Sequence, residues 1–158
     1  MTVVEHKDVE ISRVFEFSRD RVFSMWTDQK AVAKWWGPAG SEVVLCEVDP
    51  RPGGAMRIDC RASNGSVFPM TGTFTKVEAP EILEFRTEGP GPGGRFGDLP
   101  WATRNKVTFE ALGPNKTLVT VAVVVVMAAP GVAEALEQGF RGGWAESLQR
   151  LQEALTMT

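Results

Sequence analysis

The chain has 158 residues, 43% of them hydrophobic, and its 20 acidic and 17 basic side chains leave a net charge of −3. That length suffices for one self-contained domain, and that charge balance argues against nucleic-acid binding. With one histidine and two cysteines in the chain, no metal site is expected. Ser-His-Asp or Cys-His catalysis would have to use His6, which lies in a polar N-terminal stretch.

The N-terminus, the most apolar run and the cysteines bear on where the protein works. Residues 1–8 are expected to form a flexible N-terminus without the apolar core of a signal peptide, and residues 9–158 a single domain. The most apolar run, Leu118–Ala129, has 12 residues before Pro130, whereas a membrane helix needs about 20. Two cysteines are too few for a secreted disulfide framework. We therefore predict a cytoplasmic protein with reduced thiols and no membrane segment.

Three elements open the domain. They are a strand over Val9–Phe17, a helix over Arg19–Thr27 and a second short helix over about Gln29–Trp36. Alternating apolar positions indicate the strand. Ser18 fits the N-cap of the first helix, and Gly37-Pro38 ends the second.

Strands and turns follow as far as residue 127. The expected strands are Glu42–Asp49, Ala55–Ala62, Val67–Val77, Ile82–Thr87, Lys106–Leu112 and Thr117–Met127. The run Pro50-Arg51-Pro52-Gly53-Gly54 is typical of a hairpin turn. Together with the first strand, these runs predict seven strands in a mostly antiparallel meander.

One segment within this region has no periodicity. Gly89–Pro100 contains eight glycines and prolines among twelve residues, which predicts a long loop. Long loops in compact domains often serve as lids or binding elements. A hairpin tip without a role is the alternative.

A long helix is predicted over Val132–Leu155. Its apolar residues recur every three or four positions and form one stripe: Leu136, Phe140, Trp144, Leu148, Leu151 and Leu155. Gly139, Gly142 and Gly143 each cost a helix up to about 1 kcal/mol relative to alanine. They indicate either a close approach of the backbone, room beside Trp144, or a kink that divides the helix.

The expected packing is an α+β arrangement in which the curved sheet wraps around the long helix and the two short helices close one end. Four motifs in this order resemble the START-like SRPBCC superfamily, in the branch similar to the C-terminal domain of the activator of heat-shock-protein-90 ATPase. The motifs are Phe23-Ser24-Met25-Trp26-Thr27-Asp28, Trp35-Trp36-Gly37-Pro38, Asp49-Pro50-Arg51-Pro52-Gly53-Gly54, and Gly143-Trp144 with Leu148 and Leu151. The resemblance covers about residues 9–155.

This resemblance implies a helix-grip fold with a pocket between helix and sheet. It does not determine an activity, because the superfamily includes lipid carriers, hormone binders and cyclases, and a fold hosts many functions. The co-chaperone that names the branch carries a further N-terminal domain. Only about eight residues precede the first expected strand here, so we expect that domain to be absent.

Alternation along the strands predicts which side chains line the pocket. The candidates from the sheet and the helices are Trp36, Met56, Ile58, Cys60, Met70, Phe74, Phe85, Phe109, Phe140, Trp144 and Leu148. Gly72 is expected to leave a gap beside Met70 and Phe74. Such a lining suits a flat or flexible apolar ligand. The alternative for each of these residues is plain core packing.

Few polar groups are expected on the inner face. Arg13 shares its side of the first strand with Ile11 and Phe15, so it is a candidate to receive a ligand carboxylate. The alternative is a guanidinium that reaches solvent. Cys46 is expected opposite Ile58, which leaves Cys60 too distant for a disulfide.

Three functions remain after this reading. The leading one is a binding module for a small hydrophobic or aromatic ligand, without cofactor or metal. An enzyme of the cyclase or hydrolase kind is the second, but Asp59, Glu84 and Glu110 are all expected on the outer face, which disfavours acid–base catalysis. A chaperone-regulating interaction domain is the third. Because both faces of the strand from residue 117 to residue 127 are apolar, we also predict a homodimer.

Overall fold

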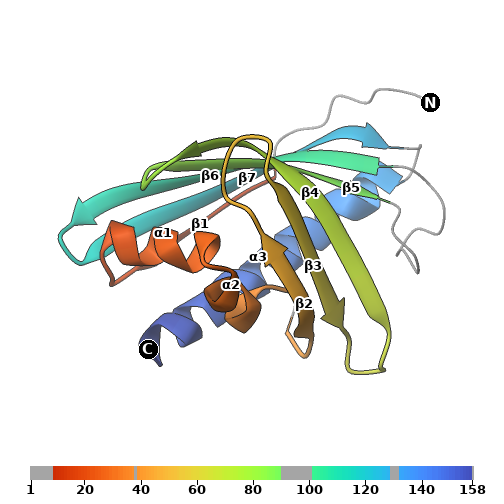
Figure 1. Ribbon diagram of the computed structural model, residues 1–158, viewed down its shortest axis with the longest axis horizontal. Coiled ribbons are helices and arrows are strands. Elements are labelled where there is room, and N and C mark those ends of the chain that lie inside the picture. The colour runs from red at the N-terminus through yellow and green to blue at the C-terminus, as the bar shows by residue number, and fades with distance from the viewer. Residues whose placement is uncertain (1–8, 38, 90–100, 129–131, 158) are drawn as a thin grey trace.

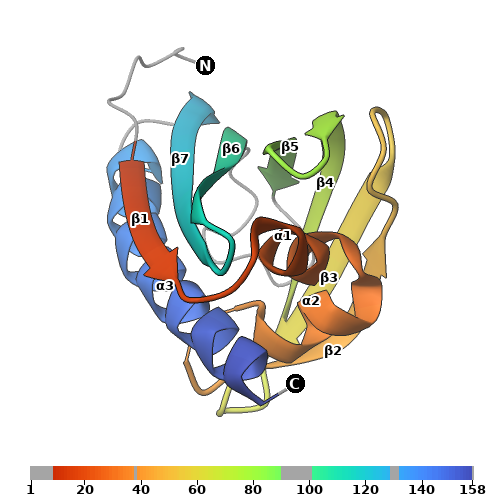
Figure 2. The ribbon, with the colours of Figure 1, turned by 90° about the vertical axis from the view of Figure 1, so that its left-hand side faces the viewer.

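The computed structural model describes residues 9–37, 39–89, 101–128 and 132–157. Seven strands form one sheet, and three helices lie against its concave side (Figures 1 and 2). The strands are β1 Val9–Phe15, β2 Glu42–Val48, β3 Ala55–Arg61, β4 Val67–Glu78, β5 Ile82–Gly89, β6 Trp101–Gly113 and β7 Lys116–Ala128. The helices are α1 Arg19–Thr27, α2 Gln29–Trp35 and α3 Val132–Thr156. The predicted α+β helix-grip fold with a seven-stranded antiparallel sheet is confirmed.

The strand order is β1-β7-β6-β5-β4-β3-β2, and every neighbouring pair is antiparallel. Strands β2 to β7 follow one another as the predicted meander. Strand β1 departs from it, because it pairs with β7, with Val9 opposite Val123 and Phe15 opposite Thr117. The chain then crosses to the far edge of the sheet through α1 and α2 (Figure 2). The two short helices therefore connect the two edge strands of the sheet, β1 and β2.

Local capping explains why α1 and α2 are short and separate. The Ser18 side chain accepts a hydrogen bond from the backbone N–H of Arg21, as predicted for an N-cap. Asp28 ends α1 and also caps α2, because its carboxylate accepts from the N–H of Lys30 at 3.0 Å. A residue that is C-cap of one helix and N-cap of the next turns the chain sharply between them.

The helix α3 is a single helix, as predicted, and the alternative of two shorter helices does not hold. A Cβ atom added at Gly142 or Gly143 would meet nothing within 4 Å. At these two positions no close approach of the backbone requires glycine.

Strand β6 begins at Trp101, five residues before the predicted start at Lys106. Residues 101–105, between the predicted loop and Lys106, were assigned to no element from the sequence. They become strand because β5 and β7 pair with them on both sides, with Asn105 opposite both Phe85 and Val123. Tertiary pairing here overrides a weak local pattern.

Position 72 corrects a second expectation. A Cβ at Gly72 would collide with the carbonyl oxygen of Arg86 and lie 3.5 Å from the Met56 sulfur. Gly72 therefore leaves no gap in the lining. It is needed because two backbones approach each other closely.

Several expectations lie outside the described residues. They concern the flexible N-terminus with His6, the lid or hairpin tip over residues 90–100, the end of the apolar run at Pro130, and the side chain of Leu136. Within the described ranges, no helix has both the length and the apolar character to span a membrane. The same ranges contain no group of three or more metal-ligating side chains.

Candidate functional site

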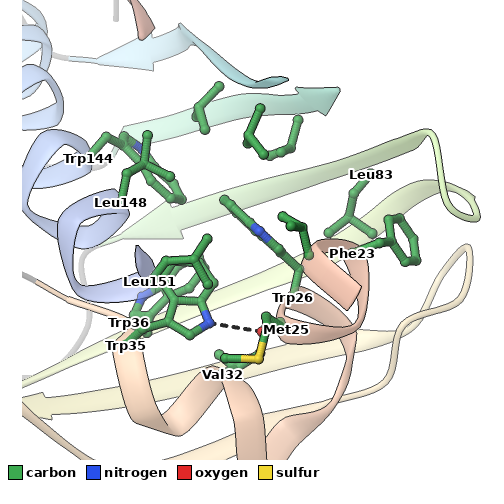
Figure 3. Packing of buried hydrophobic residues seen from close by; sticks show 14 of the residues in the cluster. Phe23, Met25, Trp26, Val32, Trp35, Trp36, Leu83, Trp144, Leu148 and Leu151 are labelled. Carbon is green, nitrogen blue, oxygen red and sulfur yellow. Dashed lines mark hydrogen bonds between the residues drawn. The ribbon is translucent and has the colours of Figure 1, made fainter. Parts of the chain in front are cut away.

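An aromatic cluster fills the centre of the interior, between α1, α2, α3 and the sheet. Trp26 of α1 stacks on Trp144 of α3, with ring centroids 5.6 Å apart and planes inclined by 17°. Trp36, just after α2, lies with its ring centroid 5.3 Å from that of Trp144 and 6.2 Å from that of Phe85. Phe109 of β6 lies 5.8 Å from Trp26. Figure 3 shows Trp26 reaching from α1 across the interior toward Trp144 and Leu148. These five rings, Trp26, Trp36, Phe85, Phe109 and Trp144, are called the aromatic cluster below.

Two neighbouring buried tryptophans differ in their hydrogen bonds. Trp35 donates its Nε1–H to the carbonyl oxygen of Met25 at 2.9 Å (dashed in Figure 3). Trp26 is only 2% exposed, yet its Nε1 has no hydrogen-bond partner among the described residues. Buried donors are nearly always paired in native proteins, so this one needs an explanation.

A polar group of three side chains interrupts the apolar inner face of the sheet. Thr87 and Thr103 face each other across β5 and β6, and their hydroxyl groups are hydrogen-bonded. The Asn105 amide donates to the Thr103 hydroxyl at 3.0 Å and to the Phe85 carbonyl oxygen at 3.1 Å. All three side chains are buried, at 0 to 5% exposure. Because Asn105 and Phe85 are direct partners in the sheet, this polar trio adjoins the aromatic cluster.

Nine of the twelve predicted lining residues are buried in one hydrophobic core. They are Trp36, Met56, Ile58, Cys60, Phe74, Phe85, Phe109, Trp144 and Leu148. Met70 and Phe140 are half-buried and pack against that core. Alternation along the strands correctly placed the strand residues of this set inward.

Arg13 lies apart from the polar trio. It is half-buried on the edge strand β1, with its guanidinium carbon 5.9 Å from the centroid of the Phe15 ring. The register places it level with Val119 and Phe109. Phe109 is four residues from Asn105, or roughly 13 Å along a strand. Arg13 and the trio therefore belong to different ends of the interior.

The cysteines are free and unsuited to nucleophilic chemistry. Cys46 lies opposite Ile58, as predicted, and neither cysteine forms a disulfide. Burial raises the pKa of each thiol from 9.0 to about 11, with Glu47 adding to the effect at Cys46. Since the thiolate is the reactive form, both thiols stay protonated at neutral pH. The expectation that Cys60 acts as a small buried hydrophobe agrees with this geometry.

A second concavity lies on the outside of the molecule. It has a volume of about 460 Å³ between the segment after α2 and the second half of α3. Its lining consists of Ala39, Gly40, Ala145, Glu146, Gln149, Arg150 and Glu153. The Glu146 carboxylate accepts a hydrogen bond from the Ala39 backbone N–H at 2.9 Å. None of the predicted site residues takes part.

The sequence reading missed Trp26, Thr87, Thr103 and Asn105 as site residues. Thr103 and Asn105 lie in the part of β6 that was assigned to no element from the sequence. Thr103, Asn105, Val107 and Phe109 occupy every second position along β6, so all four lie on one face of the strand. This spacing was a signal that could have placed Thr103 and Asn105 on the inner face. The sequence carries no comparable signal for the unpaired state of the Trp26 N–H.

The fold agrees with comparisons to known proteins. A family model described as "Activator of Hsp90 ATPase homolog 1-like protein" matches residues 16–156. The chain belongs to this family, a branch of the SRPBCC superfamily. The predicted resemblance is confirmed. A search of curated proteins found no match.

Solved structures support the fold over the whole chain. A solution structure of a protein from Arthrobacter aurescens has a TM-score of 0.80 at 24% identity, covering 99% of this chain and 94% of that one. The AHSA1 protein from Silicibacter pomeroyi has a TM-score of 0.78 at 19% identity, covering 96% and 99%. A protein from Rhodobacter sphaeroides has a TM-score of 0.77 at 17% identity, covering 99% of both chains. At such identities these similarities establish the fold and no activity.

Proposed function

We propose that this protein binds a small apolar or aromatic molecule between the concave face of the sheet and α3. The observation that carries the proposal is the polar trio Thr87, Thr103 and Asn105, buried on an otherwise apolar inner face beside the aromatic cluster. The hydrogen bonds within the trio offset the cost of burying these polar groups, but apolar side chains would fill the same place without needing any such bonds. A few polar groups in an aromatic lining are the usual composition of a ligand site. The Asn105 side-chain oxygen can accept a further bond from a ligand.

The half-buried residues define the entry to the proposed site. Met70 of β4 and Phe140 of α3 pack against the core and still reach its surface. A methionine adapts to varied shapes, and a phenylalanine offers a flat face. The proposed ligand would pass these two side chains and contact Trp36 and Trp144. Arg13, at the other end of the interior, stays a prediction as the partner of an acidic group.

Native mass spectrometry of the freshly purified protein tests the proposal first. A bound small molecule would appear as a mass above that of the 17.3 kDa chain. The uncharged fluorophore N-phenyl-1-naphthylamine tests the emptied protein, because its emission rises on entering an apolar site. No bound molecule and no fluorophore binding would overturn the proposal.

Met70→Glu is expected to weaken N-phenyl-1-naphthylamine binding at least tenfold, because a carboxylate would have to lose water at the entry of an apolar site. Thr73→Glu is the matched control: it lies on the same strand, exposed, on the opposite face. Fluorescence titration measures both affinities, and circular dichroism checks that both variants fold. Equal weakening by the two variants would place the site elsewhere.

The two alternatives receive less support. Among the described residues the buried carboxylate is Asp59, and it pairs with Arg57 at 3.2 Å on the outward side of β3. That arrangement leaves it unavailable as a general base in the interior. For a chaperone-regulating role, no feature of the described surface supplies a specific argument. We further propose that the protein acts in the cytoplasm, with its thiols reduced and without nucleic acid as a partner.

We also propose that the protein forms a homodimer through the outward face of β7. Leu118, Val124 and Val126 lie half-buried on this face, and Val14 beside Leu118 on the edge strand is 40% exposed. A second copy would cover these apolar side chains. Light scattering at micromolar concentration is expected to give twice the chain mass of 17.3 kDa. The mass of a single chain would contradict the dimer.

A further inference from the structure

The unpaired indole N–H of Trp26 is a feature that core packing does not explain. Its atom is buried and has no hydrogen-bond partner in the described part of the chain. The ring lies among others: Trp144 stacks on it at 5.6 Å, and Trp35 meets it at 4.6 Å with planes inclined by 61°. A phenylalanine would pack there without burying a donor. Leaving a donor unpaired destabilises a fold, so a tryptophan here calls for a partner outside the chain.

The position of this N–H relates it to the proposed ligand. Trp26 extends from α1 to the space between α3 and the sheet, where it faces Trp144 and Leu148 (Figure 3). Trp36 joins the same cluster, with its ring 6.3 Å from that of Trp26 and 6.2 Å from that of Phe85. Because these rings already touch and the Trp26 Nε1 atom is buried, a planar ligand would reach the indole nitrogen by displacing one of the neighbouring rings and stacking in its place.

We propose that Trp26 Nε1–H donates a hydrogen bond to an acceptor oxygen on an aromatic ligand, and that the ligand class is therefore planar aromatic ketones and related carbonyl compounds. The inference rests on the proposed function, because it concerns the same interior site. A tryptophan N–H can only donate a hydrogen bond. A carbonyl or hydroxyl oxygen of the ligand can accept that bond, whereas a hydrocarbon has no acceptor. The tryptophan acts as a specificity residue, which separates oxygenated aromatics from hydrocarbons of the same shape.

The competing explanation is a contact of the N–H with the face of a neighbouring ring. Such N–H to π contacts are weak and would need no ligand. The two explanations predict different effects of a ligand carbonyl oxygen on binding affinity. If a ring face already accepts the N–H, a ketone gains nothing over its hydrocarbon analogue.

The test uses two probes of equal shape, 2-acetylnaphthalene and 2-isopropenylnaphthalene, in which a CH₂ group replaces the carbonyl oxygen. Affinities for the full chain are corrected for each probe's transfer from water to cyclohexane. After this correction the wild-type protein is expected to prefer the ketone by at least about tenfold, because a hydrogen bond formed in an apolar medium is worth more than its net value of about 1 kcal/mol in exchange with water. Trp26→Phe should abolish this preference. Trp35→Phe is the matched control and should keep it, because the Trp35 N–H is already bonded to Met25.

A second readout does not depend on a folded Trp26 variant. In the protein with ¹⁵N-labelled indoles, the Trp26 N–H resonance should move downfield with the ketone and stay nearly in place with the alkene. A ketone preference that survives Trp26→Phe, or equal affinities without a downfield shift, would overturn the inference and leave the proposed function standing. Binding of neither probe would overturn the inference, and if native mass spectrometry and N-phenyl-1-naphthylamine also showed no binding, it would contradict the proposed function itself.

Discussion

Trp35→Ala is expected to lower the free energy of unfolding by about 3–5 kcal/mol, as large-to-small changes at fully buried aromatic residues do. The Trp35 side chain is 0% exposed, and its ring lies 4.6 Å from that of Trp26 and 5.4 Å from that of Trp36. Its removal leaves a cavity between α1 and α2 and takes the donor away from the Met25 carbonyl oxygen. Urea unfolding followed by circular dichroism measures the loss.

A comparison with Trp26 separates the hydrogen bond from the packing. Trp35→Phe replaces an indole by a smaller phenyl ring and also removes a formed hydrogen bond. Trp26→Phe makes the same change in volume, but the N–H that it removes has no described partner. The two tryptophans are equally buried, at 0% and 2% exposure. Trp35→Phe should therefore cost about 1 kcal/mol more than Trp26→Phe. Equal losses in the unliganded protein would show that the Trp26 N–H has a partner in the fold after all.

Arg150→Met is expected to lower the free energy of unfolding by about 2–3 kcal/mol, the range for hydrogen bonds to a charged group. Arg150 of α3 donates to the carbonyl oxygens of Trp36 and Gly37, both at 3.1 Å. These carbonyls lie at the C-terminal end of α2, where helix carbonyls lack intrahelical partners. Methionine keeps the aliphatic length and removes the donors. The same urea unfolding experiment measures this change.

Gln149→Ala is the matched control for Arg150, since it is the preceding residue on α3 and its exposed side chain bonds only to Glu153, at 3.3 Å. Its loss should stay within about 0.5 kcal/mol. Because Trp36 belongs to the aromatic cluster, Arg150→Met should also weaken ligand binding. A cost for Arg150→Met no larger than that for Gln149→Ala would show that the Arg150 hydrogen bonds do not help to hold α2 against α3.

The inner face was predictable from the sequence because alternation along a strand is a local property. Met56, Ile58, Phe85 and Phe109 are buried where their parity placed them. The opposition of Cys46 and Ile58 also followed from the hairpin turn, since a turn determines the register of the strands it joins. Gly72 shows the limit of such reasoning. Its position on the inner face was predicted correctly. The need for glycine there, however, comes from the Arg86 backbone of the next strand, which lies too close for a Cβ atom.

The candidate site was predicted only in its apolar part. Thr103 and Asn105 lie in a segment without apolar alternation, and they turn inward because β5 and β7 pair with that segment on both sides. Their hydrogen bonds to Thr87 and to the Phe85 carbonyl oxygen join strands that the local pattern treats separately. A polar trio of this kind forms from the sheet as a whole, so no single stretch of sequence indicates it.

The sequence by itself determined the order of the elements, the N-cap at Ser18 and the apolar stripe of α3. These features are local, because helix ends and periodic burial depend on residues within a few positions of one another. It also carried the motifs that identify the family. The tertiary structure alone decided that β1 pairs with β7 and that β6 begins at Trp101. It alone distinguished the Trp35 N–H, which is bonded, from the Trp26 N–H, which is not. The reason is that a hydrogen-bond partner is set by where packing brings distant backbone atoms, and identical residue types nine positions apart can meet different surroundings.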